Sequence, residues 1–162
     1  MLKNIVAHYS SKDENGEICV NLQRLEDDKN FRISVVNAIL QEVNDASCVL
    51  FPSFNTHQCG TPLGKLINEL ALTLQVKTLV TGDVANITSL QSPVKEVLII
   101  KQSFKKGHGL IQQINELKAM GCKVRVICLI AHSSNQLDYF RYATSVDTKA
   151  LVCLDEIPYL KG

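Results

Sequence analysis

Apolar residues in the middle of the chain follow the two periodicities of a strand–helix–strand unit. Val97–Ile100 is a short unbroken apolar run, typical of a strand buried on both faces of a parallel sheet. After a polar loop, Lys101–Gly109, apolar residues recur at helical spacing, and Gly121 follows as a helix-ending glycine. A second buried-strand run, Val124–Ile130, predicts a parallel strand joined by a right-handed crossover. The apolar positions of the predicted helix are Leu110, Ile111, Ile114, Leu117 and Met120.

A β-hairpin is predicted at the start of the chain. Asn15-Gly16 is a dipeptide favoured in tight hairpin turns, and Asn4–Tyr9 and Glu17–Leu22 are candidate strands on either side of it. The length of the chain fits one domain with a substantial core. We therefore expect a single domain over residues 1–162, with residues 1–27 as an N-terminal hairpin extension.

Helix and strand patterns alternate through the rest of the chain. Asp28 or Asn30 is the expected N-cap of one helix, and Thr61 with Pro62 is expected to begin another. Residues 82–93 are expected to form a loop with one short helical turn. This order predicts an α/β domain with a mainly parallel sheet flanked by helices. The remaining expected elements are helices over Phe31–Val43, Pro62–Leu74 and Asn135–Tyr142, strands over Ala46–Phe51, Lys77–Thr81 and Ala150–Cys153, and a terminal helical turn.

Charge and composition narrow the class of partner. The chain has 17 Lys and Arg against 16 Asp and Glu, so no net field favours nucleic acid or an anionic membrane. It has no apolar run of about 18 residues, and charges stand where a signal peptide needs apolar residues. The six cysteines form no Cys-x-x-Cys pair and are interpreted as reduced core residues. We expect a cytoplasmic protein with a small-molecule partner, without nucleic-acid or membrane partners.

The loop after the first strand of the central unit is the main candidate site. Ligands of open α/β sheets bind at the carboxyl ends of the strands, where this loop lies. Backbone amides at a helix N-terminus and two ammonium groups could hold a phosphate there. A solvated basic turn is the alternative, because the sequence lacks the spacing of a Walker motif. The candidate phosphate-binding residues are Lys105, Lys106, Gly107, His108 and Gly109.

Three histidines also lie in loops that follow predicted strands. His57, His108 and His132 would share one edge of the sheet, and their convergence as bases or metal ligands stays open. A zinc site needs three or four ligands, and these loops offer few carboxylates beyond Asp83 and Asp138. We therefore predict no metal site and assign no catalytic residue.

The order of elements resembles the type I phosphoribosyltransferases, and among them the orotate branch. The resemblance covers about residues 31–160 and rests on FRISVVNAILQEVNDASCVLFPSF, GTPLGKLINELAL, EVLIIKQSFKKGHGL and KALVCLDEI. The third segment stands where the family has its diphosphate-sugar signature: four apolar residues, two acidic residues, then a Thr- and Gly-rich loop. The resemblance implies a phosphoribosyltransferase-like fold and a small phosphorylated partner, and it leaves a homodimer open.

The diphosphate-sugar signature of this chain departs from the family pattern at the positions that contact the ribose and help orient Mg²⁺. In the family, the two acidic residues hold the ribose hydroxyls of phosphoribosyl diphosphate and help orient Mg²⁺. In this chain the ribose-site positions are Lys101 and Gln102. An ammonium group only donates hydrogen bonds and does not attract a metal cation. Where the family usually has Thr-Thr-Gly, this chain has Lys105-Lys106-Gly107, so charged ammonium groups replace hydroxyl groups.

These departures predict a divergent protein that binds a phosphorylated sugar or nucleotide, with catalysis weakened or lost. The loop that resembles the diphosphate-binding loop, with Ser53, Phe54 and Asn55, is longer than usual. One alternative is an active transferase that uses phosphoribosyl diphosphate and a nucleobase, with a carboxylate from elsewhere and Mg²⁺. Another is a non-catalytic protein-interaction domain, and a third is an unrelated open-sheet protein. No cofactor is certain, and Mg²⁺ is expected only if the protein is active.

Overall fold

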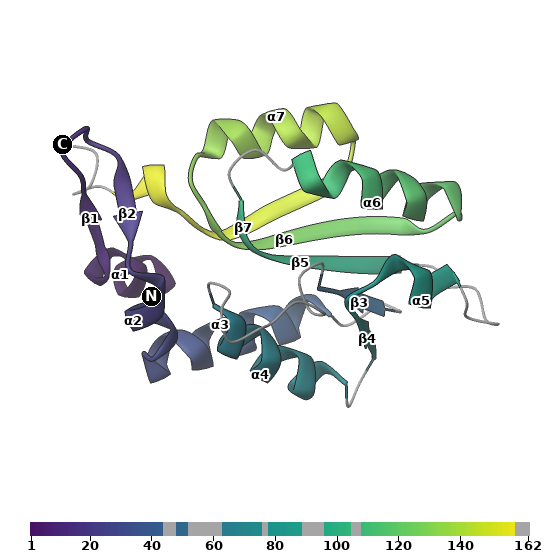
Figure 1. Ribbon diagram of the computed structural model, residues 1–162, viewed down its shortest axis with the longest axis horizontal. Helices are drawn as coiled ribbons and strands as arrows, with labels where there is room; N and C mark the ends of the chain where they lie inside the picture. Colours follow the sequence, from purple (N-terminus) through teal and green to yellow (C-terminus); the bar gives the residue numbers. More distant parts are fainter. Residues whose placement is uncertain (44–47, 52–62, 76–77, 89–95, 105–107, 158–162) are drawn as a thin grey trace.

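A parallel sheet with helices on both faces forms the centre of the computed structural model, which describes residues 1–43, 48–51, 63–75, 78–88, 96–104 and 108–157 (Figure 1). The strands are β1 (Ser10–Lys12), β2 (Ile18–Val20), β3 (Cys48–Leu50), β4 (Leu79–Thr81), β5 (Glu96–Phe104), β6 (Lys123–Ala131) and β7 (Asp147–Cys153). The helices are α1 (Leu2–His8), α2 (Leu22–Glu26), α3 (Lys29–Glu42), α4 (Gly64–Leu74), α5 (Val84–Thr88), α6 (His108–Ala119), α7 (Ser134–Thr144) and the 3₁₀ turn η2 (Leu154–Glu156).

The main sheet has the strand order β4-β3-β5-β6-β7, and every pair in it is parallel. The predicted strand–helix–strand unit is confirmed as β5, α6 and β6. The other predicted helices and strands of the α/β alternation are found as α3, β3, α4, β4, α5, α7, β7 and η2. Among the described helices, none combines the length and apolar composition that crossing a bilayer requires.

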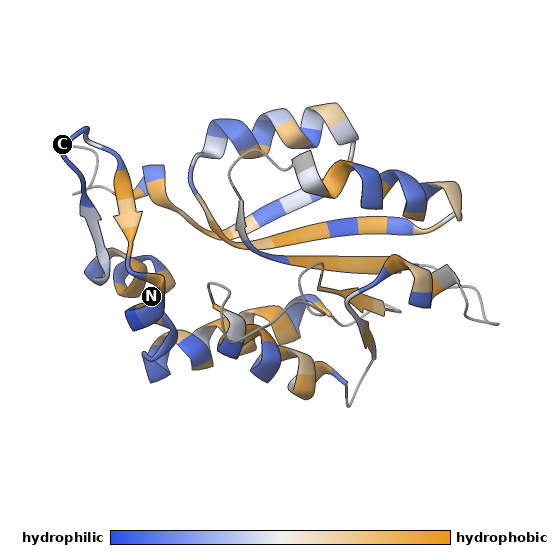
Figure 2. Cartoon of the chain, viewed as in Figure 1, coloured by the Kyte–Doolittle hydropathy of each residue, from blue (hydrophilic) through white to orange (hydrophobic). Residues whose placement is uncertain are grey.

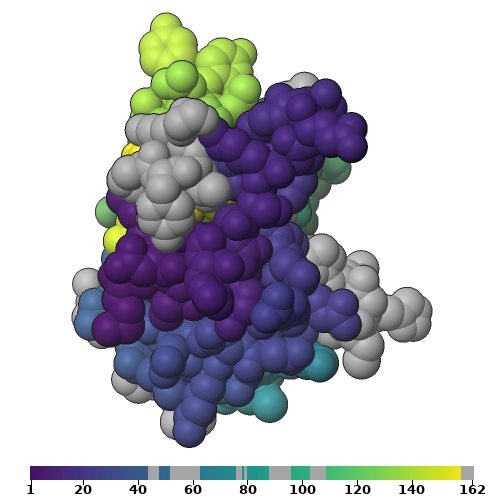
Figure 3. Space-filling model, turned by 90° about the vertical axis from the view of Figure 1, so that its left-hand side faces the viewer, coloured from purple at the N-terminus to yellow at the C-terminus, as the bar shows by residue number. Residues whose placement is uncertain are grey.

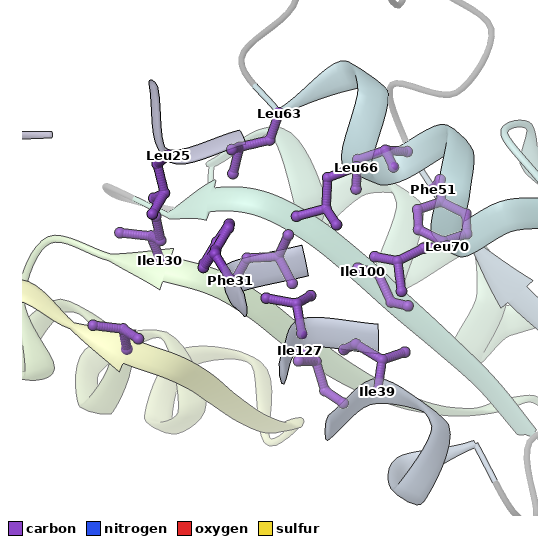
Figure 4. Packing of buried hydrophobic residues seen from close by; sticks show 14 of the residues in the cluster. Leu25, Phe31, Ile39, Phe51, Leu63, Leu66, Leu70, Ile100, Ile127 and Ile130 are labelled. Carbon is purple, nitrogen blue, oxygen red and sulfur yellow. The ribbon is translucent and has the colours of Figure 1, made fainter. Parts of the chain in front are cut away.

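Two hydrophobic layers enclose the sheet. Leu98 and Ile100 of β5 belong to the layer with α3 and α4, whereas Val97 and Ile99 belong to the layer with α6 and α7. This division follows from the alternation of side chains along a strand. Figure 4 shows the first layer around Ile100, and Figure 2 shows that the central strands are mainly hydrophobic. Both faces of β5 and β6 are therefore buried, as the unbroken apolar runs predicted.

The N-terminal hairpin is confirmed, but its first strand is not where the sequence predicted it. Residues 4–9 lie mainly in helix α1, because Leu2, Ile5 and Val6 recur at helical spacing and pack against the core. The strand that pairs with β2 is the short β1, and the pairing is antiparallel. The predicted turn is present, with Gly16 at a φ of +78°, in the left-handed region that favours glycine.

The apolar stripe of α6 is narrower than predicted. Leu110, Ile114 and Leu117 are buried, but Ile111 and Met120 are exposed at 36% and 41%. These two residues lie at the margin of the stripe, where a helix on the face of a sheet meets solvent. Gly121 has a φ of +83° directly after the helix, which confirms its predicted role in ending it.

Helix α3 is capped through a contact with the N-terminal segment. The Asp28 carboxylate accepts a hydrogen bond of 3.0 Å from the backbone N–H of Phe31, which confirms Asp28 as the N-cap. It also accepts one of 2.6 Å from the Tyr9 hydroxyl. These bonds, the one from Tyr9 foremost, lower the pKa of Asp28 below its usual value. Asp28 therefore joins α3 to the residue that follows α1.

We predict that Asp28→Ala lowers the free energy of unfolding at pH 7 by about 1 kcal/mol, the typical value of an N-cap. Because folding lowers the Asp28 pKa, this contribution is complete above the usual value of 3.8 and is lost as the pH falls through the folded-state pKa. Urea unfolding at several pH values measures the effect. Asp147→Ala, which removes an exposed carboxylate at the start of β7, is the control. Equal losses in both variants would contradict the capping role.

Candidate functional site

The carboxyl ends of the central strands and the N-terminal hairpin meet at one end of the molecule (Figure 1). Strand β5 ends at Phe104, β6 at Ala131 and β7 at Cys153. Figure 3 looks onto this end, where residues of the N-terminal segment form much of the visible face. We call the residues that follow β5, β6 and β7, together with the last residues of these strands, the carboxyl edge. It is the edge at which open α/β sheets bind ligands.

The ribose-site positions lie within strand β5, not in a loop. The predicted loop Lys101–Gly109 is therefore wrong over its first four residues, which belong to β5, and over His108 and Gly109, which begin α6. Strand β6 offers a continuous partner, with Lys101 opposite Cys128 and Phe104 opposite Ala131. Strand β5 continues beyond Ile100, where its side chains change from apolar to polar. The backbone hydrogen bonds of a sheet require only a neighbouring strand, whatever the side chains. Lys101 is half-buried, and Gln102 is buried at 8% exposure.

The predicted phosphate-binding segment is described only at its end. Lys105, Lys106 and Gly107 lie outside the described residues, while His108 and Gly109 are the first two residues of α6. Gly109 is exposed, has no left-handed φ, and has open space where a Cβ would stand. It is thus in ordinary helical backbone, and no backbone strain would oppose a side chain there. The first amides of α6 lack partners within the helix, as at any helix N-terminus.

Other predicted residues are only partly placed. Ser53, Phe54, Asn55 and His57 lie outside the described residues, so the diphosphate-loop interpretation stays a prediction and the convergence of the histidines stays open. His132 follows β6 at the carboxyl edge and is exposed.

Asp83 and Asp138, the carboxylates noted in the sequence near the predicted loops, are engaged in other contacts. The Asp83 carboxylate accepts a hydrogen bond of 2.9 Å from the backbone N–H of Ala85 at the start of α5. Asp138 pairs with Arg141 on the exposed side of α7. The described residues at the end of β5 offer a lysine and an amide but no carboxylate. They do not fit a Mg²⁺ site, because Mg²⁺ is bound through carboxylate oxygens.

A thiol and two carboxylates also gather after β7. Cys153, Asp155 and Glu156 place one potential ligand atom each within 4.8 Å of one another. One Asp155 oxygen, however, accepts hydrogen bonds of 2.9 Å from both the backbone N–H and the hydroxyl of Ser134. This carboxylate anchors the first residue of α7, so the cluster has a structural explanation.

A cavity of about 560 Å³ lies between the hairpin and the carboxyl ends of β6 and β7. The hairpin contributes Ile18, Cys19 and Val20, and the sheet contributes Ile130 and His132. Sequence reasoning missed this cavity, because its walls are distant in the sequence. The only signal was the Asn15-Gly16 turn, which predicted a hairpin but not its position.

The cavity lies near the carboxyl end of β5. Ile130, in its wall, stands opposite Ser103 of β5 in the parallel register. Neighbouring strands are about 4.8 Å apart, and Ser103 lies two positions before Lys105. A ligand of ordinary size can therefore reach from the cavity to the end of β5.

None of the described cysteines forms a disulfide, and their thiols are of two kinds. Cys19 in the hairpin is exposed, whereas Cys48, Cys122, Cys128 and Cys153 are buried. Burial raises the pKa of the buried thiols, to about 11 for Cys48. Cys19 is the described thiol most accessible to reagents, because it is the exposed one.

Comparison with solved structures decides the fold. The structure of orotate phosphoribosyltransferase from Aeropyrum pernix matches with a TM-score of 0.64 and 15% identity, over 98% of this chain and 97% of that chain. The chain has a type I phosphoribosyltransferase-like fold. Adenine phosphoribosyltransferase from Leishmania donovani matches with a TM-score of 0.66 and 8% identity, over 96% of this chain and 80% of that chain.

A third solved structure is the Mycobacterium tuberculosis orotate phosphoribosyltransferase in complex with 5-phospho-α-D-ribosyl 1-diphosphate. Its TM-score is 0.54 at 13% identity, over 96% of this chain and 89% of that chain. No protein-family model matches the sequence, and the comparison with curated proteins gives no match. The phosphoribosyltransferase-like fold is thus confirmed, while the activity of this chain is a separate question.

Within this phosphoribosyltransferase-like fold, the N-terminal segment is fastened to the first turn of α4. The helix begins at Gly64, after Leu63 in a left-handed conformation, and not at the predicted Pro62, which lies outside the described residues. Its own N-cap residue gives no side-chain hydrogen bond. Instead, the buried Glu26 carboxylate accepts one of 3.1 Å from the backbone N–H of Lys65. Glu26, which is distant in the sequence, therefore accepts a capping hydrogen bond at the start of α4.

We predict that Glu26→Ala lowers the free energy of unfolding by about 1 to 2 kcal/mol, because it leaves an amide of α4 without its acceptor. Glu26→Gln keeps an acceptor oxygen and should lose distinctly less. Urea unfolding of both variants at pH 7 is the measurement. The cap assignment would be wrong if the glutamine variant were as unstable as the alanine variant.

Proposed function

We propose that this protein is a divergent phosphoribosyltransferase-like protein that binds a phosphorylated sugar or nucleotide, with transferase catalysis weakened or lost. The observation that carries the proposal is the end of β5, where Lys101 and Gln102 stand in the positions that the resemblance gives to two acids. The proposal treats residues 1–162 as one cytoplasmic domain with residues 1–27 as an extension. A homodimer, which the resemblance left open, stays a prediction.

The phosphate is proposed to bind at the N-terminus of α6. The helix begins at His108, and its free amides and dipole favour an anion. Lys105 and Lys106 directly precede it in the sequence and add positive charge. Charge-assisted bonds from ammonium groups to phosphate are among the stronger hydrogen bonds in proteins.

The loss of catalysis is proposed from the same strand. A lysine at position 101 cannot accept hydrogen bonds from ribose hydroxyls, and its charge opposes a bound Mg²⁺. An anionic phosphate nearby would instead gain from the extra cation. The substitution therefore favours phosphate binding and disfavours the metal-assisted transfer.

We predict that replacing both Lys105 and Lys106 with Ala weakens the binding of ribose 5-phosphate by roughly 1 to 3 kcal/mol, the scale of charge-assisted hydrogen bonds. Isothermal titration calorimetry measures the affinity. The matched control is Lys29→Ala with Lys123→Ala, which removes the same charge from exposed sites on α3 and at the amino end of β6. Equal affinity in the wild type and the Lys105/Lys106 variant would remove this loop from the proposal.

We also predict little or no Mg²⁺-dependent consumption of phosphoribosyl diphosphate by the wild type with orotate or common purine bases. The double substitution Lys101→Asp and Gln102→Asp should create or enhance a Mg²⁺ dependence of ligand binding, because it restores two carboxylates. A coupled assay measures turnover, and calorimetry with and without Mg²⁺ measures binding. Rapid turnover by the wild type would refute the loss of catalysis.

A further inference from the structure

We propose that the cavity beneath the hairpin binds an uncharged, mainly apolar group of a small molecule, and not a charged or hydrogen-bonding nucleobase. The proposal rests on the proposed function and narrows it to a phosphorylated sugar that carries an apolar group in place of a base, with its phosphate at the α6 N-terminus. It concerns a different set of residues, however, so the phosphate site and the apolar site can be refuted separately.

The walls of the cavity are chiefly aliphatic. Ile18, Val20 and Leu22 come from the hairpin side, and Ile130 and Leu154 come from the sheet side. None of the described lining residues is Phe, Tyr or Trp, and the His132 imidazole at the rim is the one aromatic ring among them, whereas aromatic stacking is the usual way in which proteins hold a base. Aliphatic walls favour an apolar group, because binding removes apolar surface on both partners from water.

The charges around the cavity also disfavour an anionic ligand group. Among the described lining residues, Glu17 is the carboxylate and none is Lys or Arg. A carboxylate on a ligand ring, as in orotate, would meet no counter-charge here and would lose its hydration. Besides the Cys19 thiol, Glu17 and His132 are the described lining side chains able to hydrogen-bond. This is a small set for the several donors and acceptors of a base.

The hairpin residues are only half-buried, which leaves apolar surface for a ligand. Ile18, Val20 and Leu22 pack against the core cluster, yet none is fully buried. On the sheet side, Ile130 and Leu154 are nearly inaccessible and form a firm wall, with exposures of 2% and 1%. The hairpin wall thus keeps contact area that an apolar group would cover.

The experiment uses the uncharged dye N-phenyl-1-naphthylamine and the thiol of Cys19. The dye should gain fluorescence with the wild-type protein and should slow alkylation of Cys19 by iodoacetamide several-fold. Peptide mass spectrometry separates Cys19 from the other cysteines. Adenosine and orotidine, at the same concentrations, should protect Cys19 much less.

Two variants test the location of the dye. Val20→Arg places a charge in the wall and should weaken dye binding by roughly tenfold or more, because the charge must be desolvated. Asn37→Arg adds the same charge to an exposed position of α3, outside the described lining, and should leave dye binding unchanged. If Val20→Arg does not fold, protection of Cys19 in the wild type decides the matter alone.

The proposal is overturned if adenosine or orotidine protects Cys19 at lower concentration than the dye, which would make the cavity a base site. It is also overturned if the dye binds without protecting Cys19, or does not bind. A protein that binds the dye but not ribose 5-phosphate would keep this proposal and lose the proposed phosphate site. A protein that binds ribose 5-phosphate but not the dye would keep the proposed phosphate site and lose this proposal.

Discussion

The parallel pairing of β5 with β6 is the contact on which the rest of the structure depends. It runs from Glu96 opposite Lys123 to Phe104 opposite Ala131. Because both strands are buried on both faces, the two hydrophobic layers attach to the same pair. Parallel pairing also brings the strand ends to one edge, so the end of β5 and the wall residue Ile130 are neighbours. The position of the candidate site is thus a consequence of backbone hydrogen bonding, whatever side chains occupy it.

Charged side chains connect β5, β6 and α3 near the amino ends of the two strands. The Arg125 guanidinium lies 2.6 Å from a Glu96 carboxylate oxygen, and it donates a hydrogen bond of 2.6 Å to the backbone carbonyl of Glu42 at the end of α3. Lys149 of β7 also pairs with Glu42, and this contact lowers the Glu42 pKa. The Glu42 carboxylate also lies 3.3 Å from the Arg125 guanidinium, so one carboxylate joins α3 to the adjacent strands β6 and β7. These pairs lie toward the amino ends of the strands, away from the carboxyl ends where the candidate site lies.

Periodicity made most of the fold predictable, and its failures have local causes. Buried runs such as Val124–Ile130 are typical of internal strands, so the sheet could be predicted from the sequence. The apolar pattern of the first six or seven residues is compatible with a strand or a helix. Packing of Val6 against the core favours the helix. At Lys101, side-chain polarity suggested a loop, but the neighbouring strand held the backbone in the sheet. The cavity and the Glu26 cap were not predictable, because each depends on contacts between segments far apart in the sequence.

The cavity has one wall near the start of the chain and the other near its end. Val20 and Leu154 can face each other only after β7 has joined the sheet and the hairpin has docked on it. Contacts of such long sequence separation are slow to form, because the chain must first lose the entropy of a large loop. A partly folded chain lacks the cavity altogether. A ligand bound there would therefore favour the complete native state over every intermediate, and it would couple the hairpin and the β7 segment into one cooperative unit.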